Sequence, residues 1–205
     1  MNSKDVTELA KNGIMLTPNF TPFPTLETAR LLLRRIHVDD IEEIFILRSD
    51  PVINKNSLRP LITKKEEAME FIQKVENALI QNEGIAWVIC EIEKPKIVIG
   101  HIGIWRLMKE HYRGEIGYLI HTDFQGKGMM TEALKAAIDY GFNQLKLHSI
   151  EAHVSPKNQP SQNILERNGF VKEGYLKEDF FAKGEFHDTI LYSLLNKNDK
   201  NWVRD

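Results

Sequence analysis

A short segment with two glycines, residues 125–131 (QGKGMMT), combines the residue types that bind a diphosphate. Glycines let backbone N–H groups approach a ligand closely, and the first amides of a following helix have no partner inside that helix. The positive end of the helix dipole and the charge of Lys127 would strengthen such an anion site. The segment is not a Walker A loop, because Gly128 follows Lys127, and Thr131 replaces the third glycine of a dinucleotide loop. A ligand-free turn between strand and helix would need the same glycines, so the segment alone leaves both interpretations open.

The elements that must position this segment alternate between strand and helix patterns. We expect turns at Pro95-Lys96 and Lys183-Gly184, and a capping box from Thr63 to Glu66. The order of elements predicts a mixed α/β fold whose central sheet is mostly antiparallel, with helical crossovers late in the chain. The expected strands are 31–36, 85–92, 97–105, 113–121, 149–154, 171–180 and 185–195, and the expected helices are 39–49, 63–82, 129–142 and 160–168.

Length and composition indicate one globular domain. The chain has 205 residues and a formal net charge of -2, so it lacks the basic excess of nucleic-acid-binding proteins. Cys90 is the single cysteine, which excludes an intramolecular disulfide and a Cys-rich metal site. No apolar run reaches the ~18 residues of a membrane helix and the first residues lack an apolar signal core, so we expect a cytoplasmic protein with no membrane contact. We divide the chain into an N-terminal extension (1–24), whose prolines favour a tail or strap, a domain (25–197) and a C-terminal tail (198–205).

Several short motifs occur in an order that identifies a family. Gln125 and Gly128 fit the pattern of Gln or Arg, two residues, Gly, one residue, then Gly or Ala, although Met130 stands at the last position. In these residues the chain resembles the GNAT acetyltransferase superfamily, and within it the Rim-type enzymes, which acylate protein N-termini. The resemblance covers roughly residues 23–195. The other segments that carry it are 26–31 (LETARL), 33–34 (LR), 49–51 (SDP), 99–103 (IGHIG), 115–118 (EIGY), Asn158 with Ser161, 168–170 (NGF) and 173–174 (EG).

The resemblance implies a GNAT-like sheet and acetyl-CoA as co-substrate. In the family, two central strands splay apart, here 113–121 and 149–154, and the pantetheine arm pairs with the exposed edge of the first. Backbone amides of the glycine loop bind the pyrophosphate, and an asparagine contacts the pantetheine. The CoA-binding residues implied in this chain are Leu119, Ile120, His121, Gln125, Gly126, Lys127, Gly128, Met129, Met130, Thr131 and Asn158.

Direct acetyl transfer needs a base for the amine, and three residues could serve. Glu115 is the first candidate, on the strand that should border the acetyl group, although it could simply pair with Arg113 or Arg106. His153 is the second, and Glu151, on the same strand face, is a weaker third. At pH 7, neutralising an α-amine costs about 1 kcal/mol and a lysine about 4.6 kcal/mol. The absence of an obvious strong base therefore favours an α-amine acceptor.

Ser161 is the candidate acid for the departing thiolate. Some Rim-type enzymes have a serine there, and others use a tyrosine at the position of Leu165. A helix cap is an equal alternative for Ser161, because serine near a first turn commonly bonds free amides. Cys90 has apolar neighbours and no histidine beside it in any motif, so we expect no acyl-enzyme, and the histidines show no zinc spacing, so we expect no metal.

The sequence therefore predicts an enzyme that moves an acetyl group from acetyl-CoA to a primary amine in a ternary complex. The favoured acceptor is a protein N-terminal α-amine, ribosomal or other. Two alternatives stay open, namely a small amine such as a polyamine, amino acid or aminoglycoside, and a non-catalytic acyl-CoA-binding protein. Enzymes of this family are often homodimers, although no sequence feature marks an interface.

Overall fold

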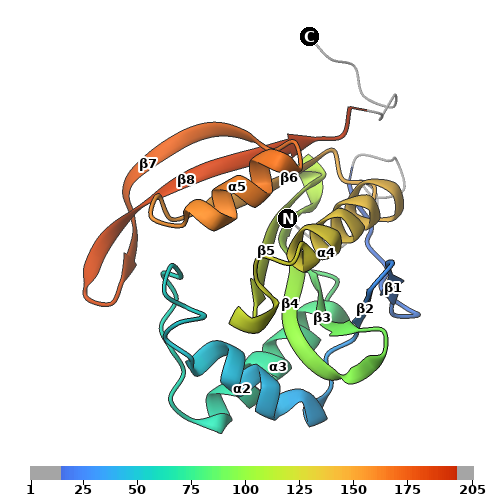
Figure 1. Ribbon diagram of the computed structural model, residues 1–205. Coiled ribbons are helices and arrows are strands. Elements are labelled where there is room, and N and C mark those ends of the chain that lie inside the picture. Colours follow the sequence, from blue (N-terminus) through green and yellow to red (C-terminus); the bar gives the residue numbers. More distant parts are fainter. Residues whose placement is uncertain (1–14, 198–205) are drawn as a thin grey trace.

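Eight strands form a single sheet in the computed structural model, which describes residues 15–197 (Figure 1). Their spatial order is β1-β2-β3-β4-β5-β6-β8-β7, and only the pair β5–β6 is parallel. This arrangement confirms the predicted mixed, mostly antiparallel sheet. The strands are β1 (Leu26–Glu27), β2 (Leu31–Arg34), β3 (Ile85–Glu91), β4 (Lys94–Met108), β5 (Arg113–Ile120), β6 (Ser149–Val154), β7 (Val171–Ala182) and β8 (Glu185–Leu195).

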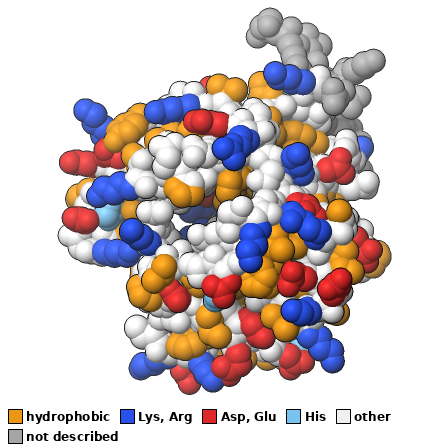
Figure 2. Space-filling model, in the orientation of Figure 1, with side chains coloured by type: hydrophobic (Ala, Val, Ile, Leu, Met, Phe, Trp, Pro, Cys, Tyr) orange, Lys and Arg blue, Asp and Glu red, His pale blue; other side chains and the backbone are white. Residues whose placement is uncertain are grey.

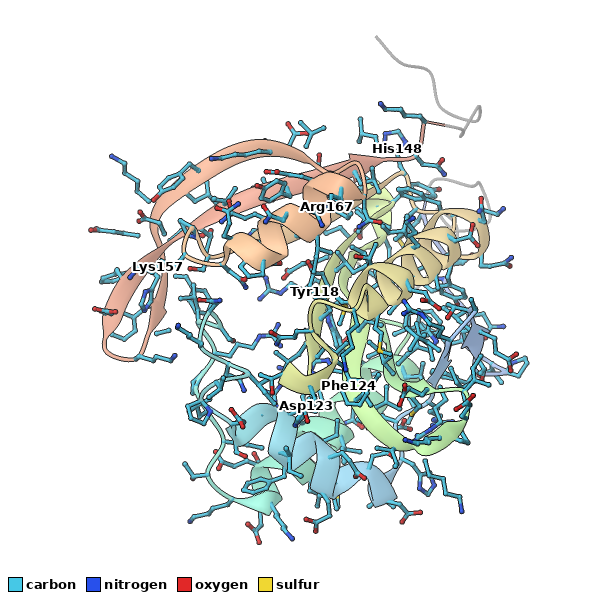
Figure 3. All side chains as sticks on the ribbon, in the orientation of Figure 1. Tyr118, Asp123, Phe124, His148, Lys157 and Arg167 are labelled. Atoms are coloured by element: carbon cyan, nitrogen blue, oxygen red, sulfur yellow. The ribbon has the colours of Figure 1, made fainter. Side chains whose placement is uncertain are left out.

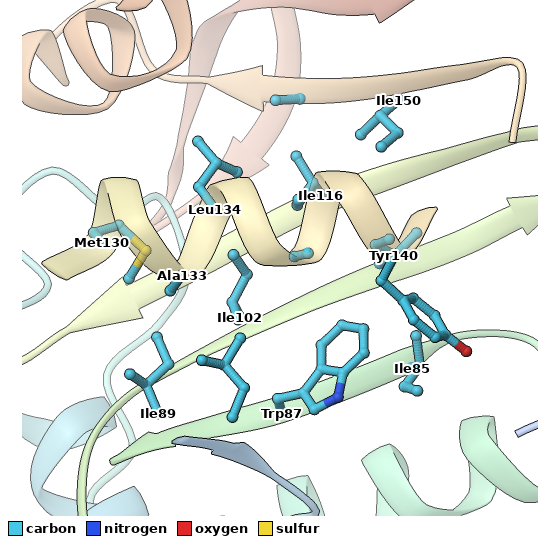
Figure 4. Close-up of a cluster of buried hydrophobic side chains, with 14 of the residues drawn as sticks. Ile85, Trp87, Ile89, Ile102, Ile116, Met130, Ala133, Leu134, Tyr140 and Ile150 are labelled. Carbon is cyan, nitrogen blue, oxygen red and sulfur yellow. The ribbon is translucent and has the colours of Figure 1, made fainter. Parts of the chain in front are cut away.

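Helices cover both faces of this sheet. In β3 the side chains of Trp87 and Ile89 join one apolar cluster with α4, while Val88 and Cys90 join a second cluster with α2 and α3. Both faces of β3 are buried, which explains why its sequence is apolar throughout rather than alternating. Figure 4 shows α4 lying across the sheet, with Ala133 on the side of the helix that faces Ile89 and Ile102. The helices are η1 (Val38–Asp40), α2 (Ile41–Ser49), α3 (Lys65–Ile80), η2 (Lys109–His111), η3 (Thr122–Phe124), α4 (Met129–Asp139), η4 (Tyr140–Gln144) and α5 (Gln159–Arg167).

The centre of the sheet opens between β5 and β6. The two strands pair at Arg113–Ser149, Gly114–Ile150 and Glu115–Glu151, and no pairing follows Glu115. Beyond that point β6 pairs with β8 on its other side, so the two halves of the sheet diverge. The predicted splay of these strands is thereby confirmed, and it begins at Glu115.

Two local predictions are wrong. The β3–β4 turn lies at Ile92 and Glu93, whereas Pro95 and Lys96 belong to β4. The register there shifts twice, so that Cys90 pairs with Val98 and Glu91 with Lys94. Pro95 therefore lies in a bulge, where no hydrogen bond between the strands requires its missing N–H. The cap of α3 uses Glu67 rather than Glu66, and its carboxylate accepts hydrogen bonds from the backbone of Thr63 and Lys64. The hairpin turn at Lys183-Gly184 is confirmed, with φ of 53° and 84°.

The last part of the N-terminal extension packs on the sheet. Leu16 and Phe20 are buried in the core, and the indole nitrogen of Trp87 donates a hydrogen bond to the carbonyl oxygen of Pro24 at 2.7 Å. Residues 15–24 thus form a strap, while residues 1–14 and the predicted tail 198–205 lie outside the described residues. Among the described residues, no helix has the length and apolar character needed to cross a membrane.

Candidate active site

The glycine segment forms a loop whose amides are free to bind an anion. Gly126 and Gly128 adopt φ of 71° and 76°, a left-handed conformation that glycine tolerates best. Gly128 is the N-cap of α4 and supplies no side-chain cap, so the first amides of the helix have no side-chain partner within residues 15–197. A Cβ atom at Gly126 would meet nothing within 4 Å, and open space therefore lies beside these amides. This geometry suits an anion at the loop, and the assignment to a diphosphate stays a prediction.

Arg30 holds this loop against the sheet. Its Nη1 donates a hydrogen bond to the carbonyl oxygen of Lys127 at 3.1 Å, and its Nη2 forms an ion pair with Glu132 at 2.6 Å. Thr28 donates a further hydrogen bond to Glu132. Burial raises the pKa of Glu132, but the hydrogen bonds from Thr28 and Arg30 outweigh it and hold the pKa below its ordinary value. The contact between Arg30 and Glu132 could not be predicted from the sequence, because the two residues are 102 positions apart.

Backbone directions along β5 select which residues face the opening. The N–H of His121 donates to the carbonyl oxygen of Ile99, in line with β4. Backbone groups alternate along a strand, so those of Leu119 also face β4, and those of Tyr118 and Ile120 face the opening. The edge predicted at Leu119, Ile120 and His121 is therefore corrected to Tyr118 and Ile120. The side chain of Gln125 donates to the Ile120 carbonyl oxygen at 3.2 Å, which ties the loop to this edge.

Tyr118 of β5, labelled in Figure 3, contacts Ser161 of α5. The two hydroxyl oxygens lie 2.9 Å apart, and either can donate. Burial raises the pKa of Tyr118 to about 12, so its hydroxyl stays protonated at neutral pH. The cap of α5 is Asn158, whose Oδ1 accepts the N–H of Ser161 at 3.2 Å. The cap interpretation of the Ser161 hydroxyl is therefore wrong, and the pairing with Tyr118 is a feature that the sequence did not reveal.

The three candidate bases lie together where the strands diverge. The side-chain ligand atoms of Glu115, Glu151 and His153 all lie within 4.8 Å of one another. Each carboxylate also has a guanidinium partner, Arg106 for Glu115 at 3.0 Å and Arg113 for Glu151. Three such ligand atoms could in geometry approach a metal ion, but the arginines already neutralise both carboxylates, and like charges disfavour a cation there. The three candidate bases thus share one place, and which of them accepts the proton stays a prediction.

Cys90 lies apart from this chemistry. Its side chain is fully buried in the α2–α3 cluster, and burial raises the pKa of its thiol to about 11. A thiol held protonated in this way is a poor nucleophile. This environment agrees with the expectation of direct transfer.

A bridge between distant segments borders the far side of the opening. Lys183, at the tip of the β7–β8 hairpin, donates a hydrogen bond through Nζ to the carbonyl oxygen of Ser57 at 3.2 Å. Ser57 lies in the connection between α2 and α3. Figure 2 shows the face of the molecule in this orientation hollowed at its centre.

Two features point to a class of protein that binds an extended, phosphorylated ligand. They are the opening between β5 and β6 and the loop with free amides at the end of that opening. Residues 30–171 match the family described as an acetyltransferase (GNAT) domain. The chain belongs to this family, which confirms the resemblance seen in the sequence, and it is an acyl-CoA-dependent N-acetyltransferase.

Relatives within the family differ in the acceptors that their names give. The chain is 35% identical to the uncharacterized N-acetyltransferase p20 of Bacillus licheniformis, over 84% of this chain and 97% of that protein. The spermidine N-acetyltransferase of Vibrio cholerae, solved with CoA and spermine, is 27% identical with a TM-score of 0.72, covering 82% of this chain and 96% of the other. The ribosomal-protein-S5-alanine acetyltransferase of Vibrio fischeri is 25% identical with a TM-score of 0.73, covering 88% and 100%.

Proposed function

We propose that the chain acetylates the N-terminal α-amine of a protein, ribosomal or other, by direct attack on acetyl-CoA in a ternary complex. The observation that carries this proposal is the pairing of both carboxylates at the diverging strands, Glu115 with Arg106 and Glu151 with Arg113. A carboxylate that already has a guanidinium partner offers little net charge to attract a polycation. An α-amine, whose ordinary pKa is about 7.7–8.0, needs only a weak base.

The donor binds in an extended form along the opening. The amides of residues 126–131 hold the diphosphate, with Lys127 near it, and the pantetheine arm runs along the edge of β5 formed by Tyr118 and Ile120. Asn158 lies at the start of α5, beside Ser161, where the family places its pantetheine contact. The free N–H on the β5 edge would donate to the carbonyl oxygen as negative charge develops on it.

Two groups of side chains would transfer the protons of the reaction, one accepting a proton from the amine and the other donating a proton to the thiolate. The neutral amine attacks the thioester carbon, the C–S bond breaks, and the amide bond forms. The amine proton passes to Glu115 or His153, directly or through water. The thiolate receives a proton from the hydroxyl pair of Ser161 and Tyr118, which regains one from solvent. No acyl-enzyme forms.

The experiment compares acceptors at equal concentration with acetyl-CoA. One peptide with a free α-amine and an internal lysine, the same peptide with a blocked N-terminus, and spermidine are incubated, and the products are located by mass spectrometry. We expect acetylation of the α-amine and little reaction of the lysine or of spermidine. Faster acetylation of spermidine would contradict the proposal, and CoA binding without thiol release on any amine would indicate a non-catalytic protein.

A polyamine acceptor is the second candidate. It is favoured by the 28% identity over 170 residues to the spermidine N(1)-acetyltransferase of Vibrio cholerae. The paired carboxylates argue against it. A cytoplasmic location, a homodimer and the absence of metal and nucleic acid stay predictions.

A further inference from the structure

Three basic side chains gather on the α2–α3 face of the sheet without an acidic partner. They are Arg48 at the end of α2, Arg59 in the α2–α3 connection, and His101 on β4, and we call them the basic cluster. None of the ion pairs formed within residues 15–197 includes any of the three. In the same part of the chain, Arg30, Arg34, Arg35, Arg106 and Arg113 each have a carboxylate partner.

Three polar atoms of the basic cluster, two in His101 and one in Arg48, are buried without a hydrogen-bond partner, whereas Arg59 is exposed. Both ring nitrogens of His101 are buried and unpaired, on a residue that is only 5% exposed. The Nε of Arg48 is also buried and unpaired, and its guanidinium carbon lies 4.1 Å from the ring centre of Phe71. The ring of His101 lies 5.4 Å from the same phenylalanine. Buried polar groups of this kind are nearly always paired in a complete assembly, so a missing partner is the simplest account.

The charges around the basic cluster indicate that the missing partner is an anion. Burial, and then the charge of Arg59, lower the pKa of Arg48 to about 10. Burial, and then Arg48 and Arg59, lower the pKa of His101 to about 3. Arg59 thus disfavours the charge of Arg48, and both arginines disfavour a charge on His101. An anion placed among them would offset this repulsion. A planar carboxylate matches the fork of an arginine side chain.

The basic cluster lies beside the site where an acceptor must enter. His101 is opposite Leu119 in the β4–β5 register, one residue from Ile120 at the opening. Leu119 itself packs against the α2–α3 cluster, on the face away from α4. Arg59 lies two residues after Ser57, whose carbonyl oxygen binds Lys183 of the hairpin. The loop that binds the diphosphate is built on the N-terminus of α4, on the other face, so the basic cluster belongs to the acceptor rather than to the donor.

We propose that Arg48, Arg59 and His101 form a subsite for a carboxylate that the acceptor carries near its amine. The inference rests on the proposed acetylation of an α-amine and narrows its substrate class to acidic acceptors. The carboxylate is either an acidic side chain at the second residue of a peptide or the α-carboxylate of a free amino acid. A polycation is excluded from the same place by like charge.

The test measures kcat/KM with matched acceptors. Peptides with N-terminal alanine differ only at the second residue, which is Asp, Asn or Lys, and a separate pair compares alanine with alanine amide. We expect the Asp peptide to exceed the Asn peptide by about tenfold or more, since a hydrogen bond to a charged group has that value. The Lys peptide should be the poorest of the three. A preference for alanine over its amide instead would assign the subsite to a free amino acid.

Variants test whether a preference for the Asp peptide over the Asn peptide depends on the basic cluster. Arg48→Gln should reduce the Asp-to-Asn ratio to about twofold or less, Arg48→Lys should keep most of it, and Lys74→Gln, on the exposed side of α3, should leave it unchanged. CoA affinity should be equal in all variants, which shows that they are folded. Equal rates for Asp and Asn peptides and for alanine and its amide, a preference for Lys, or a preference that survives Arg48→Gln would overturn the subsite. Acetylation of none of these acceptors would overturn the proposed function and with it the assignment of the cluster.

Discussion

The donor and acceptor sides of the opening are built from different materials. On the proposed donor side, backbone amides of the glycine loop and of the β5 edge would supply the binding groups, while the side chain of Arg30 holds the loop in place. On the proposed acceptor side, charged side chains would provide the chemistry. Glu115 and Glu151 each pair with an arginine of a neighbouring strand, whereas Arg48 of α2 forms no ion pair within residues 15–197. A site made of backbone tolerates sequence change as long as the glycines remain, whereas a site made of side chains changes with single substitutions. The names of the relatives, which give different acceptors on one fold, agree with this difference.

The largest expected effect is a loss of CoA affinity at the glycine loop. Gly128→Asp places a carboxylate beside the diphosphate, at a position whose Cβ would lie 3.6 Å from Arg30. At a separation of about 5 Å and an effective dielectric constant of about 20, the repulsion is about 3 kcal/mol, or roughly a hundredfold in the dissociation constant of CoA. Calorimetric titration with CoA measures it.

Gly128→Asn is the matched control. Asparagine and aspartate both tolerate a positive φ, so the pair differs only in charge. The Asn variant should lose about fivefold or less in CoA affinity. Equal losses in the two variants would show that shape, not charge, matters at this position, and the diphosphate assignment would fall.

The second effect concerns the hydroxyl pair between the two sides. Ser161→Ala should lower kcat about a hundredfold, in the lower range for general acid catalysis, with CoA affinity little changed. Tyr118→Phe removes only the partner hydroxyl and should lower kcat by a smaller factor, about tenfold. Steady-state kinetics and melting temperature are measured together. A lower melting temperature with unchanged kcat would leave both hydroxyls with a structural role only.

The third effect is a pH dependence of stability on the acceptor side. The pKa of His101 is lowered to about 3 in the folded chain, and it returns to about 6.5 on unfolding. Below pH 6.5 the unfolded chain therefore binds a proton that the folded chain does not, and stability falls as the pH falls towards 3. Between pH 7 and pH 5 this contribution is about 2 kcal/mol.

Urea unfolding of the wild type and of His101→Gln, at pH 7 and pH 5, isolates that contribution. The variant should lose about 2 kcal/mol less than the wild type between the two pH values. His111→Gln, an exposed position, should behave as the wild type does. Equal losses in the wild type and His101→Gln would mean that His101 is not a buried neutral group.

The smallest effect is expected at Cys90. Cys90→Ala should leave kcat within about twofold, because a buried thiol whose pKa is raised to about 11 takes no part in direct transfer. A stability loss of about 1 kcal/mol from the small cavity is compatible with this. Loss of activity in a folded variant would replace direct transfer by a covalent intermediate.

Local sequence signals account for what could be foreseen. The glycine loop, the Lys183-Gly184 hairpin and the three candidate bases on β5 and β6 each follow from turn chemistry or strand alternation within a few residues. The contact of Tyr118 with Ser161 joins positions 43 residues apart, and no periodicity reports it. The residues of β5 whose backbone faces the opening are Tyr118 and Ile120, rather than Leu119 to His121. Sequence alternation shows which way side chains point, but not which neighbouring strand each backbone group hydrogen-bonds to. The bulge at Pro95 was missed because proline most often marks a turn.

The divergence of β5 and β6 gives the protein an unpaired strand edge in its interior. Past Glu115, the N–H and C=O groups of β5 that face β6 have no strand to bond. An extended amide-bearing ligand in that gap would complete the ladder and connect the two halves of the sheet. Amide hydrogens of Tyr118 and Ile120 should then exchange with solvent much more slowly when CoA is bound, so the co-substrate would also act as a removable structural element.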